Sequence, residues 1–476
     1  MEIEDFRRHA HQFVDWMADY LDSVEQYPVR AQVAPGEIAG RLPASPPEDG
    51  EPMERIFADF QRDVLPGITH WQHPAFFAYF PANSSPPSLL AEMLTATLAP
   101  QCMLWQTSPA ATEMETRVLD WLRQMLGLPE GFAGVIQDSA SSATLCALLT
   151  ARERASGWRG NEDGLAAHGV MTVYVSEQVH SSADKDVMVA GIGRENLRKI
   201  AVDDQFALQP AALRAAIEAD LRAGLRPICV IATLGSTGVG AVDPLPALAE
   251  ICREHDIYLH VDAAWAGSAL VLEEWRWMID GIEGADSFVF NPHKWLFTNF
   301  DCSAHFVRAP EDLVRTLGIL PEYLKSREGD QVIDYRDWSV PLGRRFRALK
   351  LWFVIRSYGV NEIRRRIANH IELAREAAGW VEAADDFELL APLSLALFNF
   401  RYRPAGVDDP GELDRINEDL LTRLNDSGAL YLTQNKVNGA YAIRFSVGQT
   451  NTERRHTAAA WQAIQDTARA LNSPAA

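Results

Sequence analysis

The chain contains 476 residues, of which 47% are hydrophobic and 23% are charged, a balance typical of a soluble globular protein with two or more structural units. Its formal net charge is −21. That charge argues against non-specific binding to nucleic acid or to an anionic membrane, because both need a positive protein surface.

The cysteines indicate a reducing compartment. They are scattered, odd in number and form no CxxC motif, which is typical of free thiols and not of a disulfide framework or a zinc site. They are Cys102, Cys146, Cys229, Cys252 and Cys302. The first 25 residues are charged throughout, and no window approaches 18 uninterrupted apolar residues. We therefore expect a cytoplasmic protein.

The first predicted element is an amphipathic helix within residues 1–25. Its apolar residues recur at helical spacing: Phe6, Ala10, Phe13, Val14, Met17 and Leu21. A stretch rich in proline and glycine at 28–52 predicts an extended linker. So short a helix can hardly bury its own apolar face. It is expected to pack either on a second subunit or on the large domain of its own chain.

Between about residues 130 and 310, short apolar runs typical of strands alternate with helical segments. The predicted strands are 170–176, 227–235, 257–262 and 287–291, and the predicted helices are 210–224 and 244–255. This alternation indicates an α/β fold, with a mostly parallel sheet covered by helices on both faces. Ligands bind outside the carboxyl ends of the strands in such sheets. Four side chains follow predicted strands: His180, Thr237, Asp262 and Lys294.

The chain changes character after about residue 345. A long helical stretch at 347–384 is followed by two strand-like runs at 393–404 and 439–448. We therefore expect three parts: an N-terminal helical segment 1–85, a large domain 86–350 and a small α+β C-terminal domain 351–476.

Lys294 is the most informative of the residues that follow strands. It lies in DSFVFNPHKWL (286–296), between an apolar run and a Trp-Leu pair. Lysine is rarely buried. A partly desolvated lysine is either paired with an acid or has a reactive amine with a lowered pKa.

Pyridoxal phosphate needs the residue types gathered at these positions. Its aldehyde requires a lysine, its pyridine nitrogen a carboxylate, and its phosphate a helix N-terminus with hydroxyl groups. Lys294, Asp262 and the turn Ser139-Ala140-Ser141 meet these needs. The ring also needs a flat group over one face and a small one under the other, which His180 and Ala264 can supply.

Each of these residues also has an ordinary structural interpretation, as a helix cap, a turn residue, a structural histidine or a surface lysine. A rival composite is a divalent metal site formed by His260 and Asp262 with His180 and His293. It accounts for neither Lys294 nor the Ser-Ala-Ser turn, so the cofactor interpretation is favoured and no metal is expected.

The segments HVDAAWAGSA and NPHKWL closely resemble the group II pyridoxal-phosphate decarboxylases of fold type I. Nearly the whole chain is similar to the aromatic-L-amino-acid decarboxylase branch, including HWQHPAFFAYFPANSS, GVIQDSASSATLCALLTARE, ATLGSTG and PLGRRFRALKLWFV. The resemblance implies a mostly parallel sheet of the seven-stranded type. It also implies a homodimer with active sites at the interface, and an N-terminal segment that packs on the partner subunit.

The same resemblance implies the site residues. Lys294 becomes the Schiff-base lysine, Asp262 the partner of the pyridinium nitrogen, and His180 the residue that stacks on the ring. Tyr323 matches the family's catalytic tyrosine on a mobile loop, which returns a proton to Cα after CO2 leaves, directly or through His180. The remaining cofactor-binding positions are Ser139, Ala140, Ser141, Thr237, Ala264, Asn291 and His293.

The resemblance also places the substrate pocket. Trp71, Phe76, Phe77, Tyr79, Phe80 and Pro81 match its aromatic wall, which carries no basic residue for a glutamate side chain. Ala82 stands where animal enzymes have a threonine, so a catechol-specific hydrogen bond is not expected. Gln101, Met103 and Leu104 border the pocket across the dimer, and Gly343 matches members that leave room for an indole. A broad or indole- and phenyl-accepting aromatic decarboxylase is expected.

Three alternatives remain. An aromatic acetaldehyde synthase shares the cofactor site but usually lacks the loop tyrosine. Another lyase or an aminotransferase on the same fold needs neither Tyr323 nor the aromatic wall. A paralogue kept only as a binding scaffold is disfavoured by the presence of Lys294, Asp262, His180 and Tyr323. Fold alone does not separate these functions.

Overall fold

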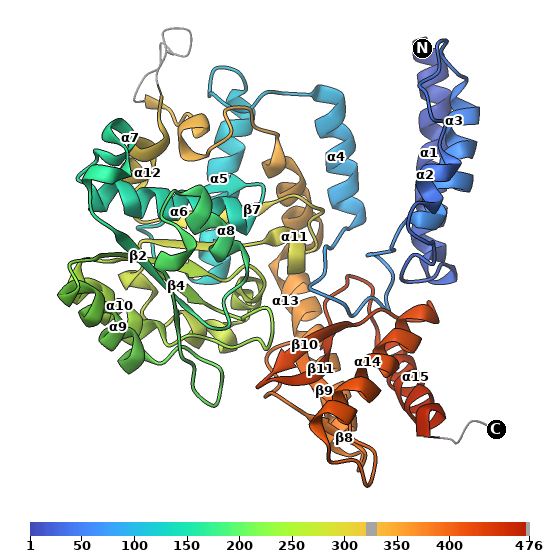
Figure 1. The fold of residues 1–476 in the computed structure, drawn as a ribbon. Coiled ribbons are helices and arrows are strands. Elements are labelled where there is room, and N and C mark those ends of the chain that lie inside the picture. The colour runs from blue at the N-terminus through green and yellow to red at the C-terminus, as the bar shows by residue number, and fades with distance from the viewer. Residues whose placement is uncertain (320–330, 473–476) are drawn as a thin grey trace. The chain divides into compact units, whose positions relative to one another are not determined.

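The computed structural model describes residues 1–319 and 331–472 (Figure 1). These residues form two compact units. The large unit comprises 82–372 and 391–398, and the small unit comprises 1–81, 373–390 and 399–472. The three-part division expected from the sequence stays a prediction, because the units are defined by compactness and each combines distant stretches of chain.

A seven-stranded sheet forms the centre of the large unit, in the order β1-β7-β6-β5-β4-β2-β3. Strands β3, β2, β4, β5 and β6 pair in parallel, whereas β7 is antiparallel to both β6 and β1. The expected mostly parallel sheet is therefore confirmed. The strands are β1 (Ala133–Gln137), β2 (Met171–Ser176), β3 (Leu197–Ile200), β4 (Arg226–Thr233), β5 (Tyr258–Asp262), β6 (Ser287–Phe290) and β7 (Ser303–Val307).

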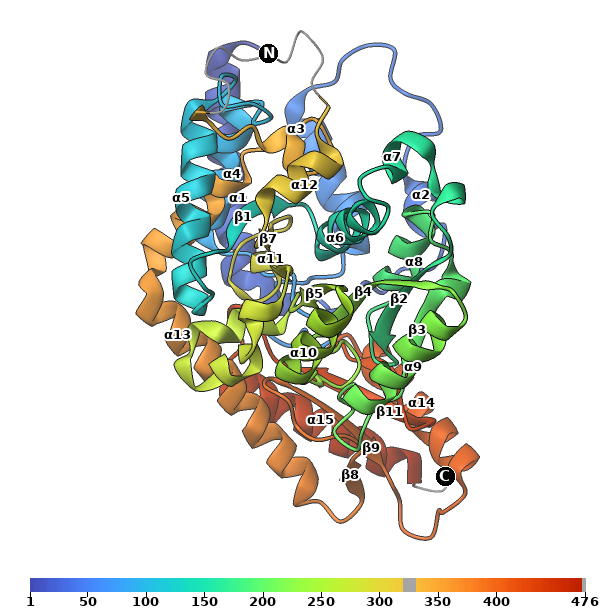
Figure 2. The ribbon, with the colours of Figure 1, turned by 90° about the vertical axis from the view of Figure 1, so that its left-hand side faces the viewer.

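Helices cover both faces of this sheet. Helices α6 and α8 lie on one face, and α9 and α10 lie on the other (Figures 1 and 2). The helices are α4 (Pro86–Leu98), α5 (Pro109–Leu126), α6 (Ala140–Ala155), α7 (Gly160–Asp163), α8 (Ser182–Val189), α9 (Pro210–Arg222), α10 (Leu245–His255), α11 (Pro292–Trp295) and α12 (Pro310–Leu317). Helix α13 (Arg347–Glu382) follows and is interrupted at Gly359, whose φ of 71° suits glycine.

The small unit combines the N-terminal helices with a four-stranded sheet. Helix α1 (Ile3–Ser23) packs on α3 (Met53–Asp59), with the Phe13 and Phe57 ring centroids 4.5 Å apart. The predicted linker at 28–52 contains the short helix α2 (Glu37–Arg41), so it is not extended throughout. The other elements are β8 (Phe387–Leu389), β9 (Leu397–Tyr402), β10 (Thr433–Val437), β11 (Ala440–Ser446), α14 (Pro410–Asp426) and α15 (Arg454–Asn472), and the sheet order is β10-β11-β9-β8.

The described part of the chain has no helix that is long and apolar enough to span a membrane.

His305, on β7, is an unusual member of the core. It is fully buried, and neither ring nitrogen has a hydrogen-bond partner among the described residues. His260, whose ring centroid is 6.0 Å away, is satisfied instead, because Thr144 Oγ1 lies 3.1 Å from its Nε2 and Ser287 Oγ 2.7 Å from its Nδ1. Burial lowers the pKa of His305 to about 3.

We expect His305→Leu to raise the free energy of unfolding by about 1–3 kcal/mol at neutral pH, since it removes unsatisfied buried polar atoms. The gain in the free energy of unfolding should grow as the pH falls below about 6.5, because His305 then binds a proton in the unfolded chain but stays neutral in the folded one. Denaturant unfolding at pH 7.5 and pH 5.5 measures both effects. His260→Leu is the matched control and should destabilise the protein. A His305→Leu variant less stable than wild type would contradict the prediction.

Candidate active site

Lys294 lies in a short helical turn at the carboxyl end of β6. The turn is fixed by its main chain: Lys294 N–H donates to Asn291 O at 2.9 Å, and Asn83 Nδ2 donates to Lys294 O at 2.8 Å. The next residue, Trp295, is fully buried and stacks on Trp265 with ring centroids 5.0 Å apart. The backbone beneath Lys294 is thus rigidly anchored, while its half-buried side chain is held at the strand end.

Asp262 ends the neighbouring strand, β5. It lies opposite Val289 of β6 in the parallel register, and Asn291 N–H donates to Ala264 O at 2.9 Å. Asp262 is 9% exposed, and its Oδ1 accepts a hydrogen bond from Ala264 N–H at 2.9 Å. Adjacent strand ends therefore carry an oriented carboxylate and a lysine.

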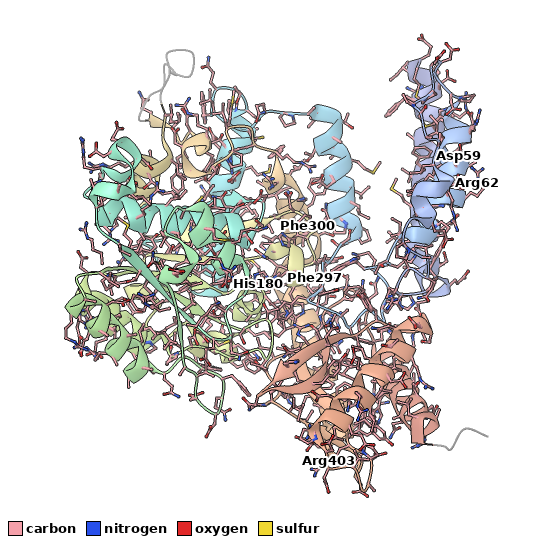
Figure 3. The ribbon with its side chains drawn as sticks, viewed as in Figure 1. Asp59, Arg62, His180, Phe297, Phe300 and Arg403 are labelled. Atoms are coloured by element: carbon pink, nitrogen blue, oxygen red, sulfur yellow. The ribbon has the colours of Figure 1, made fainter. Side chains whose placement is uncertain are left out.

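His180 follows β2 and is labelled in Figure 3. Its Nδ1 accepts a hydrogen bond from Ser182 N–H at 3.2 Å, which places the proton of the neutral ring on Nε2. The His180 side chain is exposed, yet neighbouring atoms desolvate the ring enough to lower its pKa; the charge of Lys294 lowers the pKa further, and the carboxylate of Asp262 opposes both effects. The three side chains therefore lie within electrostatic reach of one another, with His180 a neutral donor at pH 7.

Helix α6 begins beside these residues. Ser139 caps it by accepting a hydrogen bond from Ser142 N–H at 3.2 Å, and the Ser139 hydroxyl donates to Asp138 Oδ1 at 3.0 Å. The first amides of a helix have no intrahelical acceptor and attract an anion. The carboxylate of Asp138, which would repel a phosphate, thus accepts a hydrogen bond from the Ser139 hydroxyl.

Small apolar residues join this helix to the strand ends. Ala140 and Ala143 pack in one cluster with Val289 of β6 and the partly buried Ala264. The cluster brings together the two predicted positions Ala140 and Ala264.

Asn291 and His293 flank the Lys294 turn. Ser303 Oγ donates to Asn291 Oδ1 at 2.7 Å, and Cys302 N–H donates to His293 Nδ1 at 2.8 Å. Burial is the main cause that lowers the pKa of His293 to about 3. His293 is therefore neutral, with its proton on Nε2, where it can donate to an anion.

Thr237 lies in the loop after β4. Leu234 N–H donates to Asp262 O at 2.8 Å, which ties the start of this loop to the end of β5. Gly235 has a φ of 77°, and a Cβ there would lie 2.5 Å from Ala266 Cβ. The close approach requires glycine and holds the Thr237 loop against the strand ends.

The rival metal cluster does not assemble. Both ring nitrogens of His260 face hydroxyl groups, and His293 Nδ1 faces an amide. Within residues 1–319 and 331–472, no group of three or more His, Cys, Asp or Glu residues could hold a metal ion. The gathered residues fit pyridoxal phosphate instead: an amine, an oriented carboxylate, neutral donors and a capped helix N-terminus.

The expected substrate residues fall in both units. In the large unit, Gln101 and Gly343 line one pocket of about 330 Å³, and Gln101 Oε1 accepts a hydrogen bond from Arg344 N–H at 2.6 Å. Met103 and Leu104 are not among its lining residues: Met103 O accepts from Arg336 N–H at 3.0 Å, and Leu104 is buried. Ala82 is half-buried in the same unit.

The aromatic wall lies in the small unit. The Trp71 and Tyr79 rings stack with centroids 5.7 Å apart, and the Arg444 guanidinium lies 4.4 Å from the Phe80 ring centroid. Pro81 ends this segment and is buried. The structure therefore stacks Trp71 on Tyr79, and the grouping of all four residues in one substrate pocket stays a prediction. Tyr323 lies outside the described residues.

Two residues that support the candidate site were not predicted from the sequence. Asn83 holds the main chain of the Lys294 turn, and Ser303 orients Asn291. Both are buried polar residues whose partners lie in the turn around Lys294, 211 and 12 residues away in the chain, and no periodic pattern signals such contacts.

Comparison with known proteins adds independent findings. The family model described as the pyridoxal-dependent decarboxylase conserved domain matches residues 35–403. Tyrosine decarboxylase 1 of Narcissus pseudonarcissus is 43% identical, covering 99% of this chain and 94% of that protein. Phenylacetaldehyde synthase of a Rosa hybrid cultivar is 42% identical, and the match covers 99% of this chain and 96% of that protein. The structure of Oryza sativa TDC with PLP and tryptamine has a TM-score of 0.96 and 38% identity, covering 99% of each chain.

Proposed function

Because the chain belongs to the pyridoxal-dependent decarboxylase family, we propose that it converts an aromatic L-amino acid to the arylalkylamine and CO2 at a site built on Lys294, Asp262 and His180. The cofactor is pyridoxal 5'-phosphate, and the fold is that of PLP fold type I. The observation that carries the proposal is the placement of Lys294 and Asp262 at adjacent ends of β6 and β5, with His180 in electrostatic reach of both.

Pyridoxal phosphate, when bound, supplies a carbonyl carbon that condenses with amines and a protonated ring that accepts an electron pair. Lys294 Nζ would bind that carbon in the resting enzyme, until the substrate amine takes its place. Asp262 would hold the proton on the pyridine nitrogen, and His180 and Ala264 would flank the ring.

The start of α6 and the Lys294 turn would hold the phosphate end, through Ser139, Ala140, Ser141, Asn291 and His293, and Thr237 would complete the pocket. Tyr323 would return a proton to Cα, directly or through the Nε2–H of His180. The aromatic wall of Trp71, Tyr79, Phe80 and Pro81 receives the substrate ring.

The active enzyme is a homodimer in the cytoplasm. Support comes from apolar side chains left exposed on two helices: Ile3 and Phe6 of α1 are 66% and 55% exposed, and Leu90 and Leu98 of α4 are 55% and 66% exposed. Association of two chains would cover such surfaces. Light scattering of the purified protein gives its mass, and a stable monomer with full activity would refute the dimer.

An aromatic acetaldehyde synthase is the second candidate, because a synthase is among the relatives that match nearly the whole chain. Product analysis separates the two functions. The purified protein is incubated separately with tryptophan, phenylalanine, tyrosine, DOPA and glutamate, and CO2, amine, aldehyde and peroxide are followed together. We expect amine that matches CO2 from the aromatic substrates and none from glutamate. Aldehyde with peroxide would establish the synthase instead.

Gly343 is expected to set the size of the accepted ring. A Cβ at this position would lie 3.3 Å from Gln101 Nε2, so a side chain there narrows the pocket that both residues line. Lys294, Asp262 and His180 do not line this pocket, and it is assigned to the substrate because Gln101 and Gly343 match substrate positions of the family. Gly343→Ser should lower kcat/KM for tryptophan relative to that for tyrosine by about tenfold or more. Gly131→Ser, where a Cβ meets nothing within 4 Å, is the control. An unchanged ratio in Gly343→Ser would remove Gly343 from substrate selection.

A further inference from the structure

Trp295, the residue that follows Lys294, makes a polar contact that the site described above does not use. Its side chain is fully buried, and its indole N–H donates to His370 Nδ1 at 3.0 Å. His370 lies on α13 and is 2% exposed. An indole nitrogen can only donate a hydrogen bond, so His370 Nδ1 is the acceptor and the ring proton is on Nε2. A buried polar pair therefore connects α13 to the residue next to the candidate active-site lysine.

The backbone just beyond Trp295 is strained. Phe297 has a φ of 56°, in the left-handed region that favours glycine and that a bulky side chain rarely adopts. Such a conformation persists only where the surrounding structure enforces it. Ser85 Oγ, at the start of α4, donates to Phe297 O at 2.6 Å and fixes the main chain there. The turn that carries Lys294 is thus followed directly by a segment that depends on outside contacts.

Helix α13 supplies further contacts to this segment through its side chains. The fully buried ring of Phe297, labelled in Figure 3, lies edge-on to two rings of α13, with centroids 6.1 Å from His370 and 6.2 Å from Tyr358. The Arg366 guanidinium, also on α13, lies 4.8 Å from the Tyr358 ring centroid. His370 therefore contacts both of the aromatic side chains, at 295 and 297, that follow the lysine.

The stack of Trp295 on Trp265 connects the same contacts to the neighbouring strand end. The two rings are inclined by 17°, with centroids 5.0 Å apart. Trp265 follows Asp262 by three residues, in the segment that leaves β5. The indole of Trp295 thus contacts His370 and the segment after Asp262 at once. A shift of this indole would change where Lys294 lies relative to the carboxylate.

We propose that His370 is a positioning residue for Lys294: by accepting the Trp295 N–H, it holds the residues that follow the lysine in place. The inference rests on the proposed function, in which Lys294 binds the cofactor. Without an acceptor, the buried indole N–H loses its hydrogen bond, so the indole either moves or stays unsatisfied. The strained backbone at Phe297 loses part of its support at the same time. His370 itself contacts neither the cofactor nor the substrate.

The test compares His370→Leu with His370→Asn in the holoenzyme. Leucine removes the acceptor, whereas an asparagine Oδ1 can accept a hydrogen bond in place of the histidine Nδ1. We expect His370→Leu to lower kcat by about 10- to 100-fold with KM within about twofold, because the lysine is misplaced while the substrate contacts are kept. His370→Asn should keep kcat within about threefold of wild type, because the acceptor is restored. His255→Leu, at the half-buried end of α10, is the control and should match wild type.

Two readouts do not depend on turnover. The visible circular dichroism of the bound cofactor reports its orientation in the protein, and dialysis of the holoenzyme gives the rate of cofactor loss. His370→Leu should change the dichroism band and lose the cofactor about tenfold faster than wild type, since Lys294 is misplaced. A histidine that only stabilises the fold would lower the thermal midpoint and leave the dichroism of the folded variant unchanged, and that result would overturn the proposal.

A double variant tests whether His370 acts through Trp295. Trp295→Phe removes the indole N–H, so it should reproduce the losses of His370→Leu, and combining the two should add little. Losses that multiply in the double variant would overturn the proposal. Trp277→Phe, whose ring is 54% exposed, is the matched control. If His370→Leu does not fold, Trp295→Phe carries the test alone, and wild-type kcat and dichroism in that variant would refute the role of the hydrogen bond.

The outcomes separate the two proposals. Wild-type dichroism and kcat in His370→Leu, or equal losses in the leucine and asparagine variants, would overturn the role of His370 while leaving the proposed function intact. A wild-type protein that binds no pyridoxal phosphate would overturn the proposed function itself.

Discussion

Lys294→Ala is expected to lower kcat by at least about 10³-fold, to the limit of detection in a CO2-release assay. The variant loses the amine that binds the cofactor's carbonyl carbon and the general acid–base group at the same position. The fold should persist, because the turn is held through main-chain atoms: Lys294 N–H donates to Asn291 O, and Asn83 donates to Lys294 O. Alanine keeps both hydrogen bonds.

The control for this variant is Lys199→Ala, which removes a lysine whose only described ion pair is with Asp184 on the surface of the large unit. It should keep wild-type kcat. Cofactor retention shows whether a loss of kcat comes from loss of the lysine that binds the cofactor. Pyridoxal phosphate should dialyse away from Lys294→Ala and remain with Lys199→Ala. Turnover by Lys294→Ala at a rate close to that of wild type would refute the assignment of the active-site lysine.

The central residues of the site could be predicted because they follow strands. A short apolar run that ends in a polar residue is visible in one sequence, and the carboxyl ends of parallel strands meet at one edge of a sheet. Asp262 and Lys294 illustrate this: each was predicted at the end of a strand, and the structure pairs these strands as β5 and β6. The predicted strand at 257–262 differs from the observed Tyr258–Asp262 by a single residue.

The supporting residues could not be predicted in the same way. Asn83 contacts a turn 211 residues away, and its segment carries no periodicity that distinguishes it from a loop. Ser303, which orients Asn291, lies on β7, and nothing in its segment indicates that contact. Long-range contacts and burial decide these roles, and both depend on the tertiary structure.

Other differences concern weak local signals. The helix α2 within the predicted linker has only five residues and follows Gly36, whose φ is 86°. Strands β1 and β7 were not separately predicted. They pair antiparallel at the edge of the sheet, and β7 contains His305, a polar residue in a fully buried strand. Such a residue breaks the apolar pattern on which strand prediction depends.

Asp262→Asn is expected to lower kcat by about 10²- to 10⁴-fold, because an amide cannot keep the pyridine nitrogen protonated as a carboxylate does. The substitution should leave the fold intact, since an asparagine Oδ1 can still accept the Ala264 N–H hydrogen bond that now orients Asp262. The loss should therefore appear in kcat and in the absorption of the bound cofactor, with little change in the thermal midpoint.

Asp256→Asn provides the matched control, because it makes the same change six residues earlier, in the turn before β5. The Asp256 side chain is 96% exposed, and its φ of 52° lies in the left-handed region that asparagine also tolerates. This variant should keep the kcat and the cofactor spectrum of wild type. If Asp262→Asn instead decarboxylates as fast as Asp256→Asn, then the ring does not depend on a carboxylate for its proton. The electrostatic link between Asp262 and His180 would then serve to place the histidine, not to control the cofactor's charge.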